Sequence, residues 1–98
     1  MSYTIEFIPS AEKEFRKLSL DLRKQFIEKL KERAENPRVE SAKLRGMKDC
    51  YKIKLRNAGY RLVYQVIDER IVIKVVAQGK GSTTTFTKKY NYVYKNII

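Results

Sequence analysis

Residues 50–77, with the sequence CYKIKLRNAGYRLVYQVIDERIVIKVVA, decide the fold, because apolar and polar residues alternate along much of this stretch and two short turn sequences interrupt it. Alternation of this kind predicts β-strands, here over residues 50–55, 60–67 and 70–77. The interruptions at 57–59 and 68–69 are short enough to join antiparallel neighbours, so the three strands should form a meander. The last strand is apolar almost throughout, which predicts that it lies inside the sheet.

The first 40 residues add one strand and two helices in front of this meander. Residues 3–7 alternate and predict a short, half-buried strand. Ser10 is the predicted N-cap of a first helix and Asp21 that of a second helix, which ends near residues 36–37. The apolar stripes of the two helices consist of Ala11, Phe15 and Leu18, and of Leu22, Phe26, Ile27, Leu30 and Ala34.

These elements predict one α+β domain over residues 1–98. Its parts are an N-terminal strand, a two-helix hairpin and a three-stranded antiparallel meander. Because each predicted helix has one apolar face, we expect both helices to pack on the same face of the sheet.

The composition excludes several classes of active site. The 98 residues contain no histidine, so a histidine acid–base pair, a Ser-His-Asp triad and an ordinary zinc site are ruled out, and we expect no metal and no cofactor. The single cysteine, Cys50, cannot form an intrachain disulfide. No apolar run approaches the roughly 18–20 residues of a membrane span, and no signal-peptide pattern opens the sequence. The sequence therefore predicts a cytoplasmic location without a membrane partner.

Positive charge is concentrated in the second half of the chain. The net charge is +11, of which residues 1–40 contribute +1 and residues 41–98 contribute +10. Charge runs often serve only as solvated surface, but so uneven a distribution favours a basic surface that binds a polyanion. Nucleic acid, an anionic membrane face and an acidic protein are the three classes of partner with that property.

One predicted strand places cations side by side. Within residues 50–55 the side chains of Lys52 and Lys54 point to one face, and Arg56 continues that row, while the apolar side chains point to the other face. Arg61, at the start of the next strand, can join the row and bind a phosphate through two nitrogens. Neighbouring like charges repel one another, so the arrangement favours an anion held across the sheet. A solvated outer face that prevents aggregation is the alternative.

Such a row is chemically sufficient for RNA cleavage without histidine. A crowded lysine with a lowered pKa could take the proton of a 2′-hydroxyl, and an arginine could stabilise the pentacovalent phosphate. Tyr90 and its neighbours near the C-terminus could provide aromatic surfaces for bases. Packing of the same tyrosines on the core is the alternative.

Two segments, SAKLRGMKDCYKIKLR over residues 41–56 and GYRLVYQVID over residues 59–68, closely resemble the RelE toxins of bacterial toxin–antitoxin modules. The similarity is weaker but colinear over residues 1–40. It implies a microbial-ribonuclease-like α+β fold and cleavage of mRNA in the ribosomal A site through attack by a 2′-hydroxyl. It also implies neutralisation by an acidic, RelB-like antitoxin.

The resemblance assigns roles to individual residues. Lys52 and Lys54 match the family's lysines for proton abstraction and phosphate binding, and Arg61 matches its transition-state arginine. Arg45 matches a basic residue expected to grip ribosomal RNA. Together with the basic residues around the row, this gives a predicted RNA-binding set of Arg45, Lys43, Arg56, Lys80 and Tyr90.

The agreement with the family stops after Lys80. Position 81 holds Gly81 where the family has an arginine, and position 87 holds Thr87 where it has a tyrosine. Inserting one adenine in the codon of Lys80 opens a frame that gives arginine at 81 and permits tyrosine at 87. We therefore hypothesise that a one-nucleotide deletion produced the atypical tail over residues 81–98, which leaves cleavage impaired. A naturally divergent tail, with Tyr90 or Tyr92 in place of the missing tyrosine, is the alternative.

Two other functions remain open at this point. The chain could be a non-catalytic module that only binds antitoxin or RNA, which the residues at 81 and 87 favour. It could instead inhibit DNA gyrase, as ParE toxins of the same superfamily do, although the match from Lys52 to Arg61 argues against this.

Overall fold

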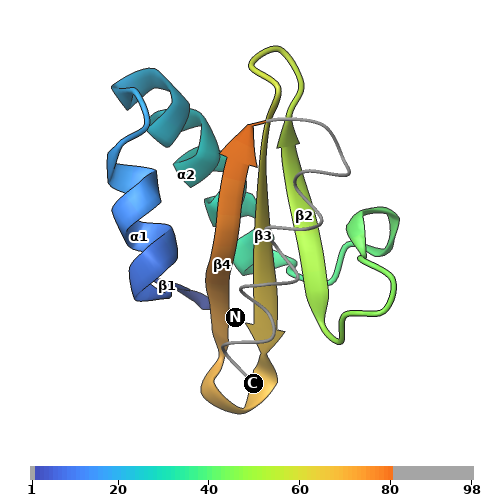
Figure 1. Ribbon diagram of the computed structural model, residues 1–98. Helices are drawn as coiled ribbons and strands as arrows, with labels where there is room; N and C mark the ends of the chain where they lie inside the picture. Colours follow the sequence, from blue (N-terminus) through green and yellow to red (C-terminus); the bar gives the residue numbers. More distant parts are fainter. Residues whose placement is uncertain (1, 81–98) are drawn as a thin grey trace.

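The computed structural model describes residues 2–80 of the 98-residue chain. The atypical tail over residues 81–98, including Tyr90, therefore lies outside the described residues. The elements follow the predicted order of one strand, two helices and three strands (Figure 1). They are β1 (Thr4–Phe7), α1 (Pro9–Arg16), α2 (Leu20–Glu35), β2 (Cys50–Leu55), β3 (Tyr60–Ile67) and β4 (Val72–Lys80), with short 3-10 turns at Glu40–Ala42 and Asp68–Arg70.

The four strands form one mixed sheet in the order β1-β4-β3-β2. Strands β2, β3 and β4 pair antiparallel, which confirms the predicted meander. Strand β4 lies between β1 and β3, so the nearly continuous apolar strand is interior, as predicted. Strand β1 pairs parallel with β4. The two helices between β1 and β2 return the chain to the starting end of the sheet, so β2 runs in the direction of β1, and the two turns of the meander give β4 that same direction.

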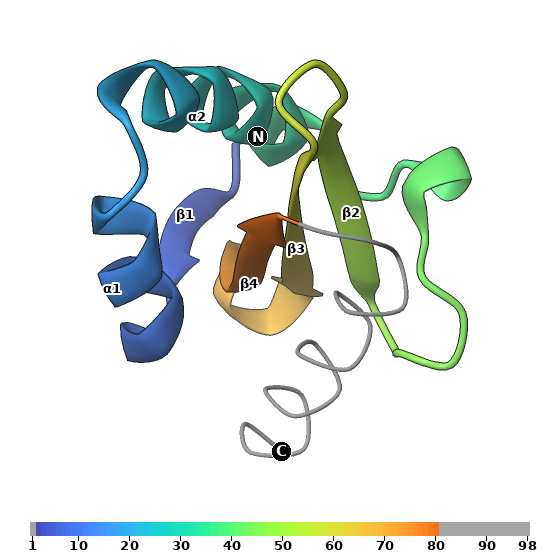
Figure 2. The same ribbon diagram turned by 45° about the horizontal axis from the view of Figure 1, so that its top comes forward.

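Both helices pack on one face of the sheet, as predicted (Figure 2). Phe26 and Leu30 of α2 are completely buried, and the rings of Phe15 and Phe26 connect the two helices with centroids 6.4 Å apart. The sheet contributes alternate residues to this core, namely Tyr51, Ile53 and Leu55 of β2, Leu62, Tyr64 and Val66 of β3, and Ile73 and Val75 of β4. None of the helices in the described part of the chain has the length and apolarity needed to cross a bilayer.

Both predicted helix caps were wrong. Helix α1 begins at Pro9 with Ile8 as N-cap, so Ser10 already lies in the first turn. Proline suits that position because its fixed φ is helical and its missing N–H would be unpaired there. Helix α2 is capped by Ser19, whose Oγ accepts a hydrogen bond from the backbone N–H of Leu22. Asp21 instead accepts a hydrogen bond from Gln25 one turn further on.

The limits of β4 also differ from the predicted residues 70–77. Arg70 belongs to the 3-10 turn, and Ile71 adopts a left-handed conformation with φ of 54°, so the strand begins only at Val72. At its other end the strand continues to Lys80, because Tyr60 at the start of β3 pairs with it. The turn is therefore longer, and the final hairpin extends further, than the alternating pattern alone indicates.

Candidate active site

The sheet face opposite the helices carries the predicted cationic row. In β2, Lys52 and Lys54 alternate with buried core residues and therefore point away from the helices. Lys54 is paired with Arg61 of β3, and Lys52 is paired with Val63. The structure thus places the side chains of Lys52, Lys54 and Arg61 on the same face of two adjacent strands.

The crowding of these cations changes the acidity of Lys54. Its pKa is lowered from the ordinary lysine value, mainly by the positive charge of Lys52, then by that of Arg61, with smaller contributions from desolvation and Arg56. A lysine surrounded by cations gives up its proton more easily because deprotonation relieves repulsion. Lys54 is exposed, so the neutral amine is accessible to a substrate from solvent.

The turn between β2 and β3 forms a small hollow next to the row. It has a volume of about 280 Å³. Gly59 enables this turn with its positive φ of 70°, a conformation that other residues rarely adopt. The cations Lys54, Arg56 and Arg61 all contribute to the walls, so the hollow is suited to a phosphate group. Its full lining is Lys54, Leu55, Arg56, Gly59, Tyr60 and Arg61.

The opposite side of β2 holds the row in register. Tyr51 and Ile53 are 2% and 1% exposed, so a slip of one residue would bury lysines in the core. The ring of Tyr51 stacks on that of Tyr64 in β3, with centroids 5.8 Å apart. Burial of the apolar side chains therefore determines where the cations lie.

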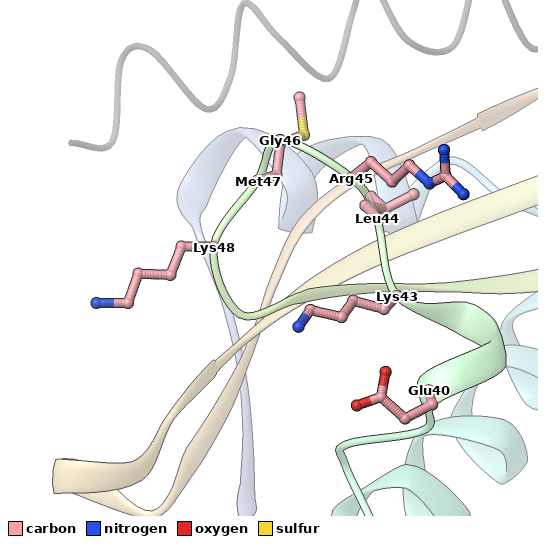
Figure 3. A pocket seen from close by; sticks show the side chains of 7 residues that line it. All are labelled: Glu40, Lys43, Leu44, Arg45, Gly46, Met47 and Lys48. Carbon is pink, nitrogen blue, oxygen red and sulfur yellow. The ribbon is translucent and has the colours of Figure 1, made fainter.

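The loop before β2, which contains Lys43 and Arg45, packs through two apolar residues on the sheet face that carries the row. Leu44 and Met47 pack on a second apolar cluster formed by Cys50, Val63, Val76 and Ala77, which lies on the face opposite the helices. The loop surrounds a hollow of about 710 Å³ lined by Glu40, Lys43, Leu44, Arg45, Gly46, Met47 and Lys48 (Figure 3).

Cations surround this loop hollow on several sides. Lys43 forms an isolated bridge with Tyr51 along β2. Arg45 extends away from Lys43 and Lys48 (Figure 3). Lys48 was absent from the predicted set, although it belongs to the same basic loop.

The remaining predicted RNA-binding residues are not part of the row. Lys80 is paired with Tyr60, and its Nζ lies 6.0 Å from the centre of that ring. Because Arg61 pairs with Gly79, alternation places Lys80 on the helix side of the sheet, at the strand end next to the row. Tyr90 lies outside the described residues.

Arg33 and Arg38 hold the strands around the site, and neither belongs to the site residues predicted from the sequence. Arg33 of α2 donates hydrogen bonds to the backbone carbonyl of Lys52 and to the hydroxyl of Tyr64, at 3.1 and 3.0 Å. Arg38 donates to Asp49 and Asp68 at 2.9 and 2.6 Å. In the sequence both are merely basic residues near the end of a helix, which gives no signal for these long-range contacts.

The model of the ParE toxin family of type II toxin–antitoxin systems matches residues 5–84. The mRNA interferase toxin RelE of Escherichia coli K12 is 58% identical over 98 residues, with 100% of each chain covered. The chain belongs to the RelE toxins of this family. The mRNA interferase RelE of Shigella flexneri shows the same identity and coverage.

Solved structures of RelE toxins have the same fold as this RelE-type chain. A double arginine-to-alanine variant of the Escherichia coli toxin RelE in the free state superposes with a TM-score of 0.88 at 50% identity, over 100% of both chains. The intact Escherichia coli RelBE toxin–antitoxin complex gives a TM-score of 0.80 at 56% identity, over 83% of this chain and 99% of that chain. The expected RelE-like α+β fold is thereby confirmed.

Proposed function

We propose that this RelE-type protein is the toxin of a type II toxin–antitoxin module and acts as a ribosome-dependent mRNA endoribonuclease that inhibits translation. The observation that carries the proposal is the pairing of Lys54 with Arg61, with Lys52 on the same sheet face. Relatives that are 58% identical over their whole length are mRNA interferases, which supports the same class of activity here.

The row is suited to cleavage by an internal nucleophile. Lys54, with its lowered pKa, takes the proton of the 2′-hydroxyl, and the resulting oxygen attacks the adjacent phosphorus. The bond from phosphorus to the 5′-oxygen then breaks, which leaves a 2′,3′-cyclic phosphate, and the 5′-oxygen takes a proton from solvent water. Arg61 stabilises the charge on the pentacovalent phosphate, and Lys52 binds the phosphate. The cations of the neighbouring loop, Lys43 and Arg45, bind the RNA backbone nearby.

Cleavage by this chain is expected to be weak. Gly81 and Thr87 occupy the positions where the family has an arginine and a tyrosine. Loss of one contact to the developing charge and of one acid or stacking group should each lower the rate on the order of a hundredfold or more. Anion binding by Lys52, Lys54 and Arg61 does not depend on these two positions and should remain.

The partner that neutralises the toxin is an acidic, RelB-like antitoxin. The Escherichia coli relative is known in complex with its antitoxin, both intact and as an antitoxin peptide. The charge of +10 on residues 41–98 offers electrostatic attraction to an acidic segment that folds on binding.

The deciding experiment measures mRNA cleavage on programmed ribosomes at a matched salt concentration. Three proteins are compared: this chain, a tail-restored chain with residues 81–98 read in the alternative frame, and the tail-restored chain with Lys54→Ala. We expect cleavage by the tail-restored chain, cleavage at least about a hundredfold slower by this chain, and none above background for Lys54→Ala. Equal cleavage by the first two would contradict the impairment, and cleavage by none would contradict the nuclease assignment.

The match to the ParE family model gives a specific reason to test gyrase inhibition as a second candidate. Inhibition of gyrase by binding does not require a lysine that abstracts a proton. Toxicity that persists unchanged in Lys54→Ala, together with inhibited supercoiling by purified gyrase, would favour this function. Antitoxin binding without either activity would favour a non-catalytic module.

A further inference from the structure

Two of the three residues in the row belong to an edge strand. Strand β2 is the last in the order β1-β4-β3-β2, so within residues 2–80 only one of its sides is covered by a neighbouring strand. On the inner side, the carbonyl of Asp49 accepts the backbone N–H of Val66 at 2.8 Å. Carbonyls alternate in direction along a strand, so those of Cys50 and Lys52 point outward, away from β3. Edge strands of this kind separate from a sheet more easily than interior strands.

The outward carbonyls at the start of β2 are nevertheless paired. That of Cys50 accepts the backbone N–H of Leu44 at 2.9 Å. The carbonyl of Lys52 accepts a hydrogen bond from Nη1 of Arg33 at 3.1 Å, which connects α2 to the strand. On the outer edge of β2, Arg33 thus adds a contact from α2 at Lys52, beside the bridge between Lys43 and Tyr51.

Arg33 is itself held in place by the core. The same Nη1 donates to the hydroxyl of Tyr64 at 3.0 Å, and the guanidinium lies 5.7 Å from the centre of the Tyr64 ring. Tyr64 is 0% exposed, and its hydroxyl donates to the backbone carbonyl of Pro37 at 2.7 Å. A long side chain that is half-buried and donates from one terminal nitrogen to both the core and the strand loses its freedom before substrate binds, so it can transmit the rigidity of the core to the strand edge.

We propose that Arg33 is a positioning residue of the active site, which clamps the edge strand β2 at Lys52 and so fixes the separation of Lys52 and Lys54 from Arg61. The role rests on the proposed nuclease function, since it concerns the alignment of the same three cations. Arg33 lies on the helix side of the sheet and does not touch the substrate face. Its effect reaches the site through the backbone of residue 52.

The first test does not depend on activity. Amide hydrogen exchange is measured by NMR on the full chain, on Arg33→Met, and on Arg16→Met as a matched control. Arg16 is exposed on α1, and within residues 2–80 its ion pair is with Glu12 of the same helix. Arg33→Met should accelerate exchange at Tyr51 and Ile53 roughly tenfold or more, with the interior strand β4 and the Arg16→Met control unchanged. Unchanged exchange at Tyr51 and Ile53 would overturn the clamp, whether or not the protein cleaves RNA. Equal acceleration in β4 would show general loss of stability and would overturn it as well.

The second test connects the clamp to the site. Tyr64→Phe leaves the charge of Arg33 in place but removes the hydroxyl that orients it, so it should accelerate the same amides by a smaller factor. In the tail-restored chain, both substitutions should lower kcat and leave KM unchanged, because they alter alignment and not RNA contacts. The pKa of Lys54, followed by NMR, should rise toward its ordinary value as the distance between Lys54 and Arg61 increases.

Different results would contradict the positioning role of Arg33 and the nuclease function of the protein. Faster exchange with an unchanged kcat and an unchanged pKa of Lys54 would mean that Arg33 holds the strand but does not position the site. Absence of cleavage in the tail-restored parent would refute the nuclease function. In that case the exchange rates and the Lys54 titration would still decide whether Arg33 holds the cationic row.

Discussion

The two faces of the sheet are built from the same strands but follow opposite rules. On the helix side, Tyr51, Ile53 and Tyr64 are at most 2% exposed and pack into one apolar core. On the other side, Lys52 and Lys54 stand next to Arg61, and their like charges repel one another. In and next to β2, each of the helix-side core residues Tyr51, Ile53 and Leu55 is directly followed by a cation, so a shift of one face along the strand also shifts the other.

This difference shows how a stable core can support an unfavourable charge cluster. Repulsion among the three cations raises the free energy of the folded state. Separating them, however, would require a shift in register that exposes the core side chains. Apolar burial is the larger contribution, since one fully buried side chain contributes about 1.5–3 kcal/mol. Exposed charges repel one another much more weakly because water screens them. The site is thus held together by residues on the opposite face.

The largest expected effect is on chemistry from the cationic face. Lys54→Ala in the tail-restored chain should lower the rate of mRNA cleavage about 10²–10⁴-fold, because the proposed general base is lost. The midpoint of urea unfolding should stay the same or rise slightly, since an exposed, repelled charge is removed. Lys29→Ala, an exposed lysine on α2, is the matched control for cleavage. A large loss of stability in Lys54→Ala would break the distinction between the two faces.

At the neighbouring residue Ile53, substitution should lower stability, in contrast to Lys54, where it should lower cleavage. Ile53→Ala removes a side chain that is 1% exposed and should lower the free energy of unfolding by about 2–5 kcal/mol. Urea unfolding followed by circular dichroism measures this, with Lys54→Ala as the comparison one residue away on the same strand. If the two substitutions destabilised the protein equally, the core face would not be what maintains the register.

A third prediction concerns pH. The charge of Lys52 is the main cause of the lowered pKa of Lys54, so Lys52→Gln should raise that pKa toward the ordinary lysine value. The base acts when neutral, and its neutral fraction grows as the pH rises through the pKa. The rise of the cleavage rate should therefore move to higher pH in Lys52→Gln. NMR titration of the Lys54 side chain checks the shift directly, and a pKa that fell or stayed constant would contradict electrostatic coupling within the row.

The smallest effect is expected at Ile71, in the turn before β4. Its φ of 54° is unfavourable for a β-branched residue, whereas asparagine adopts this conformation more easily. Ile71→Asn should stabilise the fold by about 1 kcal/mol without changing cleavage, because the residue is 38% exposed and distant from the row in the fold. Ile71→Val retains the β-branch and should give no gain. A lower unfolding midpoint for Ile71→Asn would show that the apolar contacts of Ile71 outweigh the strain.

The predicted limits of strands were correct where apolar and polar residues alternate over several residues. The limits of β2 and β3 agree with the predicted residues 50–55 and 60–67, because alternation over six to eight residues leaves little choice of register. Helix starts were less predictable because Ser10, Ser19 and Asp21 are all suitable caps in isolation. Competition between such neighbouring residues is decided by how each helix meets the sheet, as at Ile8, whose N–H is bonded to the carbonyl of Val75.

Contacts between distant residues could not be predicted in the same way. The parallel pairing of β1 with β4 joins residues about seventy positions apart, and the bond from Arg33 to Lys52 joins two different elements. Neither contact produces a periodic pattern in the sequence.

The sequence alone determined which side chains share a face of β2, because direction in a strand follows from a period of two, and it determined that this face is cationic. Its resemblance to the RelE toxins also led to the prediction, through Gly81 and Thr87, that two positions of the family pattern are altered. Two contacts became visible only in the folded protein. Arg33 donates a hydrogen bond to the backbone carbonyl of Lys52, and Lys54 is paired with Arg61 across the β2–β3 hairpin. The physical reason is that side-chain direction is a local property of the backbone, whereas the distance between charges depends on how separate elements pack.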